Sequence, residues 1–136
     1  MENENNELMI VNEGKTKVYC SKKAETNEEK KELFNALEKC DVLLNDCVGQ
    51  EIMMKDLYIE ERNGTDESGR TKVKFRTIIF DENGQTYATG SYGIYNILKK
   101  IITIYGLPTE WDSPIKVQVA KRPIDNGKST LTLILM

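Results

Sequence analysis

Residues 70–106 read RTKVKFRTIIFDENGQTYATGSYGIYNILKKIITIYG, and they contain the strand, turn, strand and helix from which the fold is predicted. The first strand covers residues 70–80, where charged and apolar side chains alternate before an apolar run. The Asn-Gly pair at residues 83–84 is the dipeptide that a tight hairpin turn prefers. Residues 85–89 are therefore predicted to return as the partner strand.

A helix is predicted over residues 92–105, because apolar side chains recur there at helical spacing. Gly106 stands at the position that commonly ends a helix, and Pro108 lies just beyond it. The apolar stripe consists of Ile94, Ile97, Leu98, Ile101, Ile102 and Tyr105. We therefore expect this stripe, Tyr105 included, to pack in the core.

The N-terminal half adds strand and helix signals. Two apolar runs flank Gly14 within residues 8–22, which indicates a long bent strand or a hairpin. A helix is predicted over about residues 26–40, because Thr26 or Asn27 can cap it and acidic side chains follow at its positive end.

Alternation and turn residues place the other strands. Residues 51–61 predict a strand, and the polar stretch NGTDESG at residues 63–69 predicts the turn after it. Two more strands are predicted at residues 115–120 and 131–135, with the turn between them at residues 123–128.

These elements predict one mainly β domain with two helices over residues 8–136, preceded by a disordered acidic tail at residues 1–7. The main helix falls between strands three and four, which is the order of an OB-like five-stranded barrel. The helix at about residues 26–40 is then an insertion. The alternative is a different small α+β sheet with helices packed on one face.

Composition argues against catalysis. Histidine is absent, which removes the usual general base, the commonest metal ligand and the partner of a catalytic serine or cysteine. Cys20, Cys40 and Cys47 form an odd set without CxxC spacing, so free thiols in a reducing cytosol are expected. No phosphate-loop, dinucleotide or HExxH motif is present. We expect a binding protein without cofactor or metal, with a small carboxylate-only enzyme as a minor alternative.

Hydropathy and charge bear on location and partners. No apolar run approaches the roughly 18 residues that span a bilayer, and the opening MENENNE is unlike a secretory leader, so a cytoplasmic protein is expected.

Residues 1–69 contain nine Lys/Arg and seventeen Asp/Glu, whereas residues 70–136 contain ten Lys/Arg and five Asp/Glu. A basic face on the second half can bind a polyanion, although ordinary scatter of surface charge is the alternative.

The main candidate site is a row of cations on the first strand of residues 70–106. Alternation places Arg70, Lys72, Lys74 and Arg76 on one face, about 7 Å from one to the next. This spacing is close to that of phosphates in an extended single strand, so the row can follow a nucleic-acid backbone. The alternative is a solvated sheet face.

A second basic set lies near the C-terminus and consists of Lys116, Lys121, Arg122 and Lys128. The last three flank or occupy the final loop, which in an OB barrel is one of the two loops that bind the oligonucleotide. A third, weaker set around the first strand consists of Lys15, Lys17, Lys22 and Lys23.

Aromatic side chains can supply the other half of a single-strand site, because bases stack on them with little sequence preference. The predicted stacking platforms are Tyr58, Tyr87 and Tyr92, with Tyr19 and Tyr95 as further candidates. Phe80 is predicted to be core. Trp111, between two prolines, is predicted to anchor its loop.

Three stretches together resemble a known family. They are TIIFDENGQTYATGSYGIYNILKKIITIYG (77–106), IKVQVA (115–120) and NGKSTLTLILM (126–136). Their pattern of strand, acidic-glycine turn, Tyr-Ala strand, helix and paired terminal strands is similar to that of the single-stranded DNA-binding proteins of protein-primed tailed phages of Gram-positive hosts. The resemblance covers roughly the second half of the chain and implies a viral replication protein that coats the displaced strand.

The leading hypothesis is therefore a single-stranded DNA-binding protein without sequence preference. Replication proteins are further candidate partners, no membrane is expected, and the oligomeric state is left open. The rival hypothesis is a phage or mobile-element module that binds a host protein, with the acidic N-terminal half and the inserted helix as the docking surface. A continuous basic groove in the folded chain favours DNA, whereas scattered lysines favour the rival.

Overall fold

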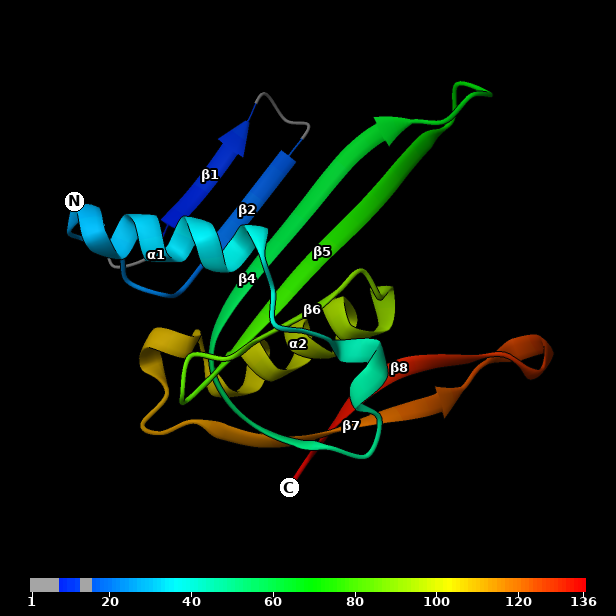
Figure 1. The fold of residues 1–136 in the computed structure, drawn as a ribbon. Coiled ribbons are helices and arrows are strands. Elements are labelled where there is room, and N and C mark those ends of the chain that lie inside the picture. The colour runs from blue at the N-terminus through cyan, green and yellow to red at the C-terminus, as the bar shows by residue number, and fades with distance from the viewer. Residues whose placement is uncertain (1–7, 13–15) are drawn as a thin grey trace.

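The computed structural model describes residues 8–12 and 16–136, and the predicted tail at residues 1–7 lies outside this part. The described chain is mainly β, with two α-helices and one eight-stranded sheet (Figure 1). The strands are β1 (Leu8–Asn12), β2 (Thr16–Cys20), β3 (Val42–Leu43), β4 (Glu51–Thr65), β5 (Thr71–Asp81), β6 (Thr86–Thr89), β7 (Ile115–Pro123) and β8 (Ser129–Leu135). The helices are α1 (Asn27–Glu38) and α2 (Tyr92–Tyr105), with short 3₁₀ turns at Leu44–Cys47, Pro108–Glu110 and Asp125–Gly127.

The long strand β4 organises the sheet. Its first residues, 51–54, pair with β7, and its later residues, 58–62, pair with β2 on the same edge. The opposite edge pairs with β5 almost throughout, with one irregularity between Met54 and Asp56. Because two strands share one edge of β4, the sheet bends there and curls into a half-barrel (Figure 1).

The predicted strand count and helix position were wrong in detail. Of the two forms predicted for residues 8–22, the structure supports the hairpin, since β1 and β2 pair in antiparallel and contribute two strands to the sheet; Gly14 lies outside the described residues. Residues 86–89 form a full member of the sheet, and β3, which pairs in parallel with β6, is too short to show a sequence period. The helix α2 consequently lies between the sixth and seventh described strands instead of the third and fourth.

Two long hairpins extend from the body of the fold, β4–β5 and β7–β8 (Figure 1). The predicted turn at residues 63–69 was placed to begin two or three residues too early. The strand β4 continues to Thr65, which pairs with Thr71. Ladder hydrogen bonds need no apolar side chain, so polar residues can extend an exposed hairpin. Asp66 then makes the turn, where its carboxylate accepts hydrogen bonds from the backbone amides of Ser68 and Arg70.

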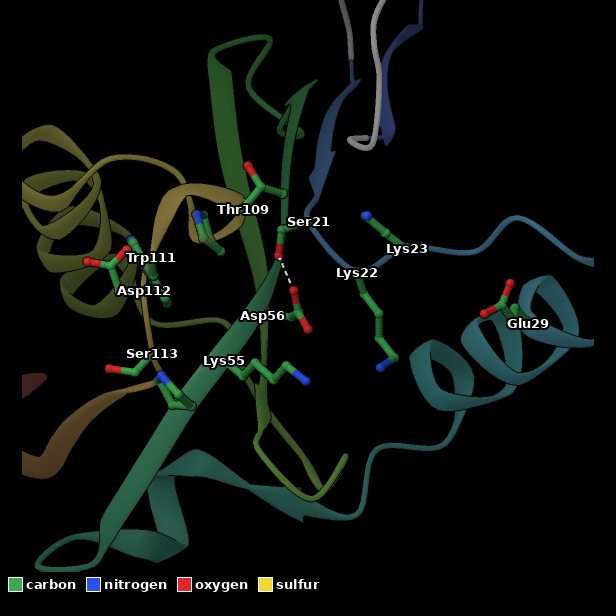
Figure 2. A pocket seen from close by; sticks show the side chains of 12 residues that line it. Ser21, Lys22, Lys23, Glu29, Lys55, Asp56, Thr109, Trp111, Asp112 and Ser113 are labelled. Carbon is green, nitrogen blue, oxygen red and sulfur yellow. Dashed lines mark hydrogen bonds between the residues drawn. The ribbon is translucent and has the colours of Figure 1, made fainter.

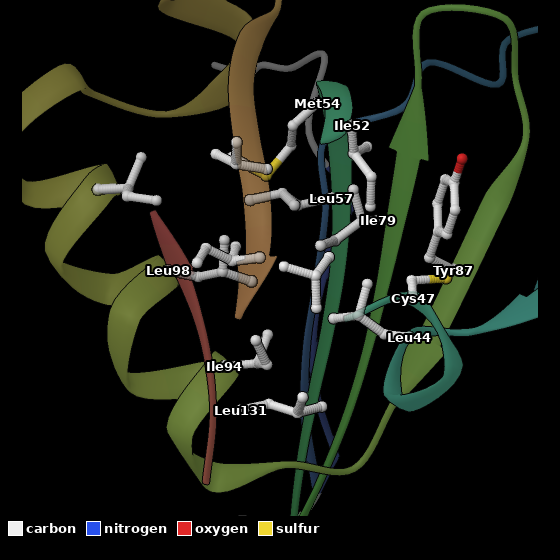
Figure 3. Close-up of a cluster of buried hydrophobic side chains, with 14 residues drawn as sticks. Leu44, Cys47, Ile52, Met54, Leu57, Ile79, Tyr87, Ile94, Leu98 and Leu131 are labelled. Carbon is white, nitrogen blue, oxygen red and sulfur yellow. The ribbon is translucent and has the colours of Figure 1, made fainter. Parts of the chain in front are cut away.

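Helices cover both faces of the sheet. On one face, Leu33 of α1 packs in a cluster with Tyr58 and Ile78. On the other, α2 packs over a larger core that includes Leu57 and Ile79 (Figure 3). Neighbouring residues of one strand therefore belong to different cores, because side chains alternate across a sheet.

The helix α1 begins as the sequence predicts. Thr26 accepts a hydrogen bond from the backbone amide of Glu29, whose carboxylate accepts one from the Thr26 amide in return. Its apolar stripe is narrow, since Leu33 is buried whereas the neighbouring Phe34 is 64% exposed.

The helix α2 also keeps its predicted ends, with Ser91 capping the Ile94 amide and Gly106 in the left-handed region at φ 87°. Tyr105 is 51% exposed and not in the core, although it follows the buried Ile101 by one turn of the helix. No α-helix in the described part of the chain is long and apolar enough to cross a membrane. Cys20, Cys40 and Cys47 are free thiols.

Ile101→Asp tests the packing of α2. Ile101 is 2% exposed, and burying an unpaired carboxylate costs several kcal/mol, a large part of the stability of a small domain. We expect the variant to be unfolded or to melt far below the parent in a thermal denaturation followed by circular dichroism.

Ile104→Asp is the matched control, since Ile104 lies in the same helix and is 76% exposed. It is expected to melt close to the parent. Equal melting of the two variants would show that α2 does not pack through Ile101.

Candidate nucleic-acid interface

The cation row of β5 lies on the face of the β4–β5 hairpin that carries α1. Cross-strand register places Lys72 beside Gly64 and Lys74 beside Arg62, and residues in register share a face. Arg62 therefore joins the row from the neighbouring strand. Sequence patterning missed it, because its place in the row depends on the pairing of β4 with β5.

Arg62, Lys72 and Lys74 line a surface hollow of about 620 Å³ next to the hairpin tip. The tip adds two carboxylates to its lining, Asp66 and Glu67. The Asp66 carboxylate accepts the Ser68 hydroxyl at 2.6 Å, and this hydrogen bond together with nearby backbone amides lowers its pKa. The hollow therefore combines three cations with acids at one end.

Arg76 has a different environment from the other cations of its row. It is half-buried, and its Nη2 atom donates a 2.6 Å hydrogen bond to the backbone carbonyl of Leu37 near the end of α1. Cations at this end of a helix also interact favourably with its dipole. Arg76 thus attaches α1 to the sheet, which gives it a structural task apart from any ligand.

The opposite face of the hairpin carries an aromatic cluster made of Phe75, Tyr92 and Tyr95. The ring centroid of Phe75 lies 4.1 Å from the ring centroid of Tyr95 and 5.4 Å from that of Tyr92. Tyr92 is 60% exposed, so one ring of the cluster is open to a ligand. Sequence reasoning named Tyr92 but missed Phe75, whose alternation with the lysines of β5 was the available signal.

Tyr95 is held in place by its hydroxyl, which donates a 2.8 Å hydrogen bond to Glu61. Burial, followed by this hydrogen bond, raises the pKa of Tyr95 to about 12. The ammonium of Lys99 lies 5.2 Å from the centroid of the Tyr95 ring, a cation–π distance. A positive charge therefore accompanies the aromatic cluster.

Two predicted stacking platforms are covered by the fold. Tyr58 is 8% exposed and Tyr87 is 3% exposed, because both faces of the sheet are covered where these residues lie. The Tyr58 hydroxyl donates to Glu60 at 2.7 Å, and the Tyr87 hydroxyl donates to Asp81 at 3.2 Å. Burial raises the pKa of both hydroxyls. Neither ring offers a free face for a base in this structure.

The second basic set does not form one surface. Lys116 makes a 3.2 Å ion pair with Glu51. Lys121 and Arg122 are consecutive in β7, so their side chains point to opposite faces, and Lys128 lies in the turn before β8. All four are exposed, and Lys121 shares its face with the core residue Val119. The hairpin offers separate cations and no continuous row.

A pocket of about 490 Å³ lies beside the end of β2 (Figure 2). Its charged lining consists of Lys22, Lys23, Lys55, Glu29, Asp56 and Asp112. Ser21 donates a 2.9 Å hydrogen bond to Asp56 at its wall. With equal numbers of lysines and carboxylates, the pocket is no binding site for a polyanion.

Trp111 belongs to the same pocket lining and anchors its loop as predicted. Its indole N–H donates a 2.8 Å hydrogen bond to the Gly106 carbonyl, and its ring packs against the α2 core. Among the residues that the structure describes, no three acidic or cysteine side chains gather as metal ligands.

Comparison with known proteins identifies a family. The family described as Phage Single-stranded DNA-binding protein matches residues 12–136, a range that extends the resemblance from the second half to nearly the whole chain and includes α1. Searches of curated proteins and of solved structures return no match.

Proposed function

Since the chain belongs to the family of phage single-stranded DNA-binding proteins, we propose that it coats the strand displaced during phage DNA replication, protects it and prevents its re-pairing. The match over residues 12–136 is the observation that carries this proposal. Binding would be independent of sequence, without cofactor or catalysis, and would take place in the cytoplasm of the host cell.

The strand's phosphates would lie along Arg62, Lys72 and Lys74, with Arg70 continuing the row at the hairpin tip. Side chains on one face of a strand repeat about every 7 Å, which suits successive phosphates of an extended single strand. The register of β4 and β5 supports this path, since it makes the row two strands wide.

Bases would reach the aromatic cluster around the open edge of β5. The strand β6 pairs with β5 only from Thr77 onward, so no described strand pairs with that edge over residues 71–74. At this edge of β5, Lys74 lies on one face of the sheet and Phe75 lies on the other. A nucleotide at this edge can contact a lysine with its phosphate and stack its base toward Tyr92.

The elements from β4 to β8 also support an OB-like interpretation of the half-barrel. Three strands, the helix α2 and two further strands follow in order, and the first of these strands pairs with the fourth. A partly open barrel of this kind is a common scaffold for oligonucleotides. The strands β1 and β2, with α1, would then be an addition to one edge.

Preference for single strands is the direct test of this function. In a fluorescence-anisotropy titration, oligo-dT is expected to bind more tightly than a duplex of the same length, because only unpaired bases can stack on Tyr92. Equal or tighter binding of the duplex contradicts the proposal. Absence of binding to either would favour the rival function, a module that binds a host protein.

Lys72→Ala combined with Lys74→Ala tests the phosphate path. Each lost phosphate contact lowers the slope of log affinity against log salt by about 0.7 for a single strand, so a reduction of about 1.4 is expected. Stability should change little, because exposed charges contribute little to folding. Arg76 is left unchanged, since its loss would also detach α1.

The control for this variant is Lys23→Ala combined with Lys55→Ala, which removes the same charge from the mixed pocket of Figure 2. It should leave the salt slope unchanged. An unchanged slope in the Lys72/Lys74 variant, with normal melting, would place the DNA elsewhere.

Tyr92→Ala tests the stacking platform. Loss of one stacked base weakens single-strand binding by about 1–3 kcal/mol, so affinity for oligo-dT should fall by that amount. Tyr105→Ala is the control, because Tyr105 is a similarly exposed tyrosine at the other end of α2. Equal affinities of the two variants for oligo-dT would show that the aromatic cluster is not part of the DNA-binding site.

A further inference from the structure

We propose that α1 contributes a nucleobase subsite in which Phe34 stacks one base of the bound strand. The inference rests on the proposed function and extends it to α1. Apart from this subsite, α1 has only its packing on the sheet to account for it. It assigns a ligand contact to the N-terminal half of the chain.

Phe34 lies in a groove that continues the cationic hollow. This groove has a volume of about 510 Å³, and its lining includes Phe34 from α1 together with Arg62 and Lys74 from the hairpin. Arg62 and Lys74 also line the hollow at the hairpin tip. A strand that follows the cations away from the tip therefore arrives at Phe34.

Phe34 is a large apolar side chain that α1 leaves exposed. The side chain is 64% exposed, although it follows the buried Leu33 and lies beside the apolar contacts of α1 with the sheet. Exposed phenylalanine next to cations is the combination that binds single strands, since the ring stacks a base and the cations hold its phosphates.

Rigid support holds Phe34 in this position. The Thr26–Glu29 capping box fixes the start of α1, and Leu33 is buried in the core beneath it. Near the other end, Arg76 donates its 2.6 Å hydrogen bond to the Leu37 carbonyl. A stacking ring on an anchored helix loses little conformational freedom when a base binds.

Carboxylates in the groove decide which part of a nucleotide fits there. Glu60 is engaged by the Tyr58 hydroxyl at 2.7 Å and by the Nη2 atom of Arg62 at 2.8 Å, an ion pair that compensates the charge of Glu60 and part of the charge of Arg62. The Arg62 side chain is 63% exposed, so its remaining N–H groups can reach a phosphate. Glu38 lies at the α1 side of the groove and would repel a phosphate. A neutral base can lie beside it, which places the base at Phe34 and the phosphates at Arg62 and Lys74.

Phe34→Ala is the decisive variant, measured by anisotropy titration with oligo-dT long enough to cover the hairpin and α1. Loss of one stacked base corresponds to about a 5- to 150-fold weaker affinity. Ile104→Ala is the control for removal of an exposed apolar side chain, and it should bind like the parent. Phe34→Tyr keeps the ring and should restore binding.

Phe34→Trp gives a second readout that does not depend on the stability of the alanine variant. A base stacked on the new indole should quench its fluorescence, beyond any change that the parent shows from Trp111. Parent-like affinity of Phe34→Ala, or an unquenched Phe34→Trp, would overturn the subsite.

Failure of the subsite and failure of the proposed function are distinguishable. If the parent binds oligo-dT and the Lys72/Lys74 variant has a shallower salt slope, whereas Phe34→Ala binds like the parent, only the subsite is wrong. If the parent does not bind oligo-dT, both proposals are wrong.

Discussion

The bend of β4 is the constraint on which the rest of the structure depends. One edge of this strand pairs first with β7 and then with β2, and the change falls near the irregularity at Met54 and Asp56. The sheet curls here, and Ile52 and Leu57, which lie on either side of the irregularity, belong to one core with α2. Both long hairpins leave the body from the ends of this curve.

Strand alternation separates the two halves of the candidate site. Lys72 and Lys74 point to the α1 side of the hairpin, whereas Phe75 points to the α2 side, where it meets Tyr92 and Tyr95. A further strand on this edge of β5 would keep these groups apart, but no described strand pairs with the edge over residues 71–74. The strand that we propose binds here could therefore contact the lysines and the aromatic rings from that edge.

Several side chains that were predicted to contact DNA are buried or half-buried in the fold. Tyr58, Tyr87 and Arg76 have the chemistry of a DNA contact, yet each is occupied by hydrogen bonds inside the structure. What remains exposed is a smaller set with acids interspersed, such as Glu38 and Asp66.

Local signals in the chain are enough to predict its helices and turns, because caps, turn residues and periodicity act over a few residues. Thr26 and Ser91 start their helices, Gly106 ends α2, and the alternation of β5 places its lysines on one face. Tertiary structure alone decided the eight-stranded sheet, the place of Arg62 beside Lys74, and the exposure of Phe34 with the burial of Tyr58. All of these features depend on which distant strands pair and on which face of the sheet a helix covers. Pairing between segments that are remote in the chain produces no periodic pattern in the local sequence.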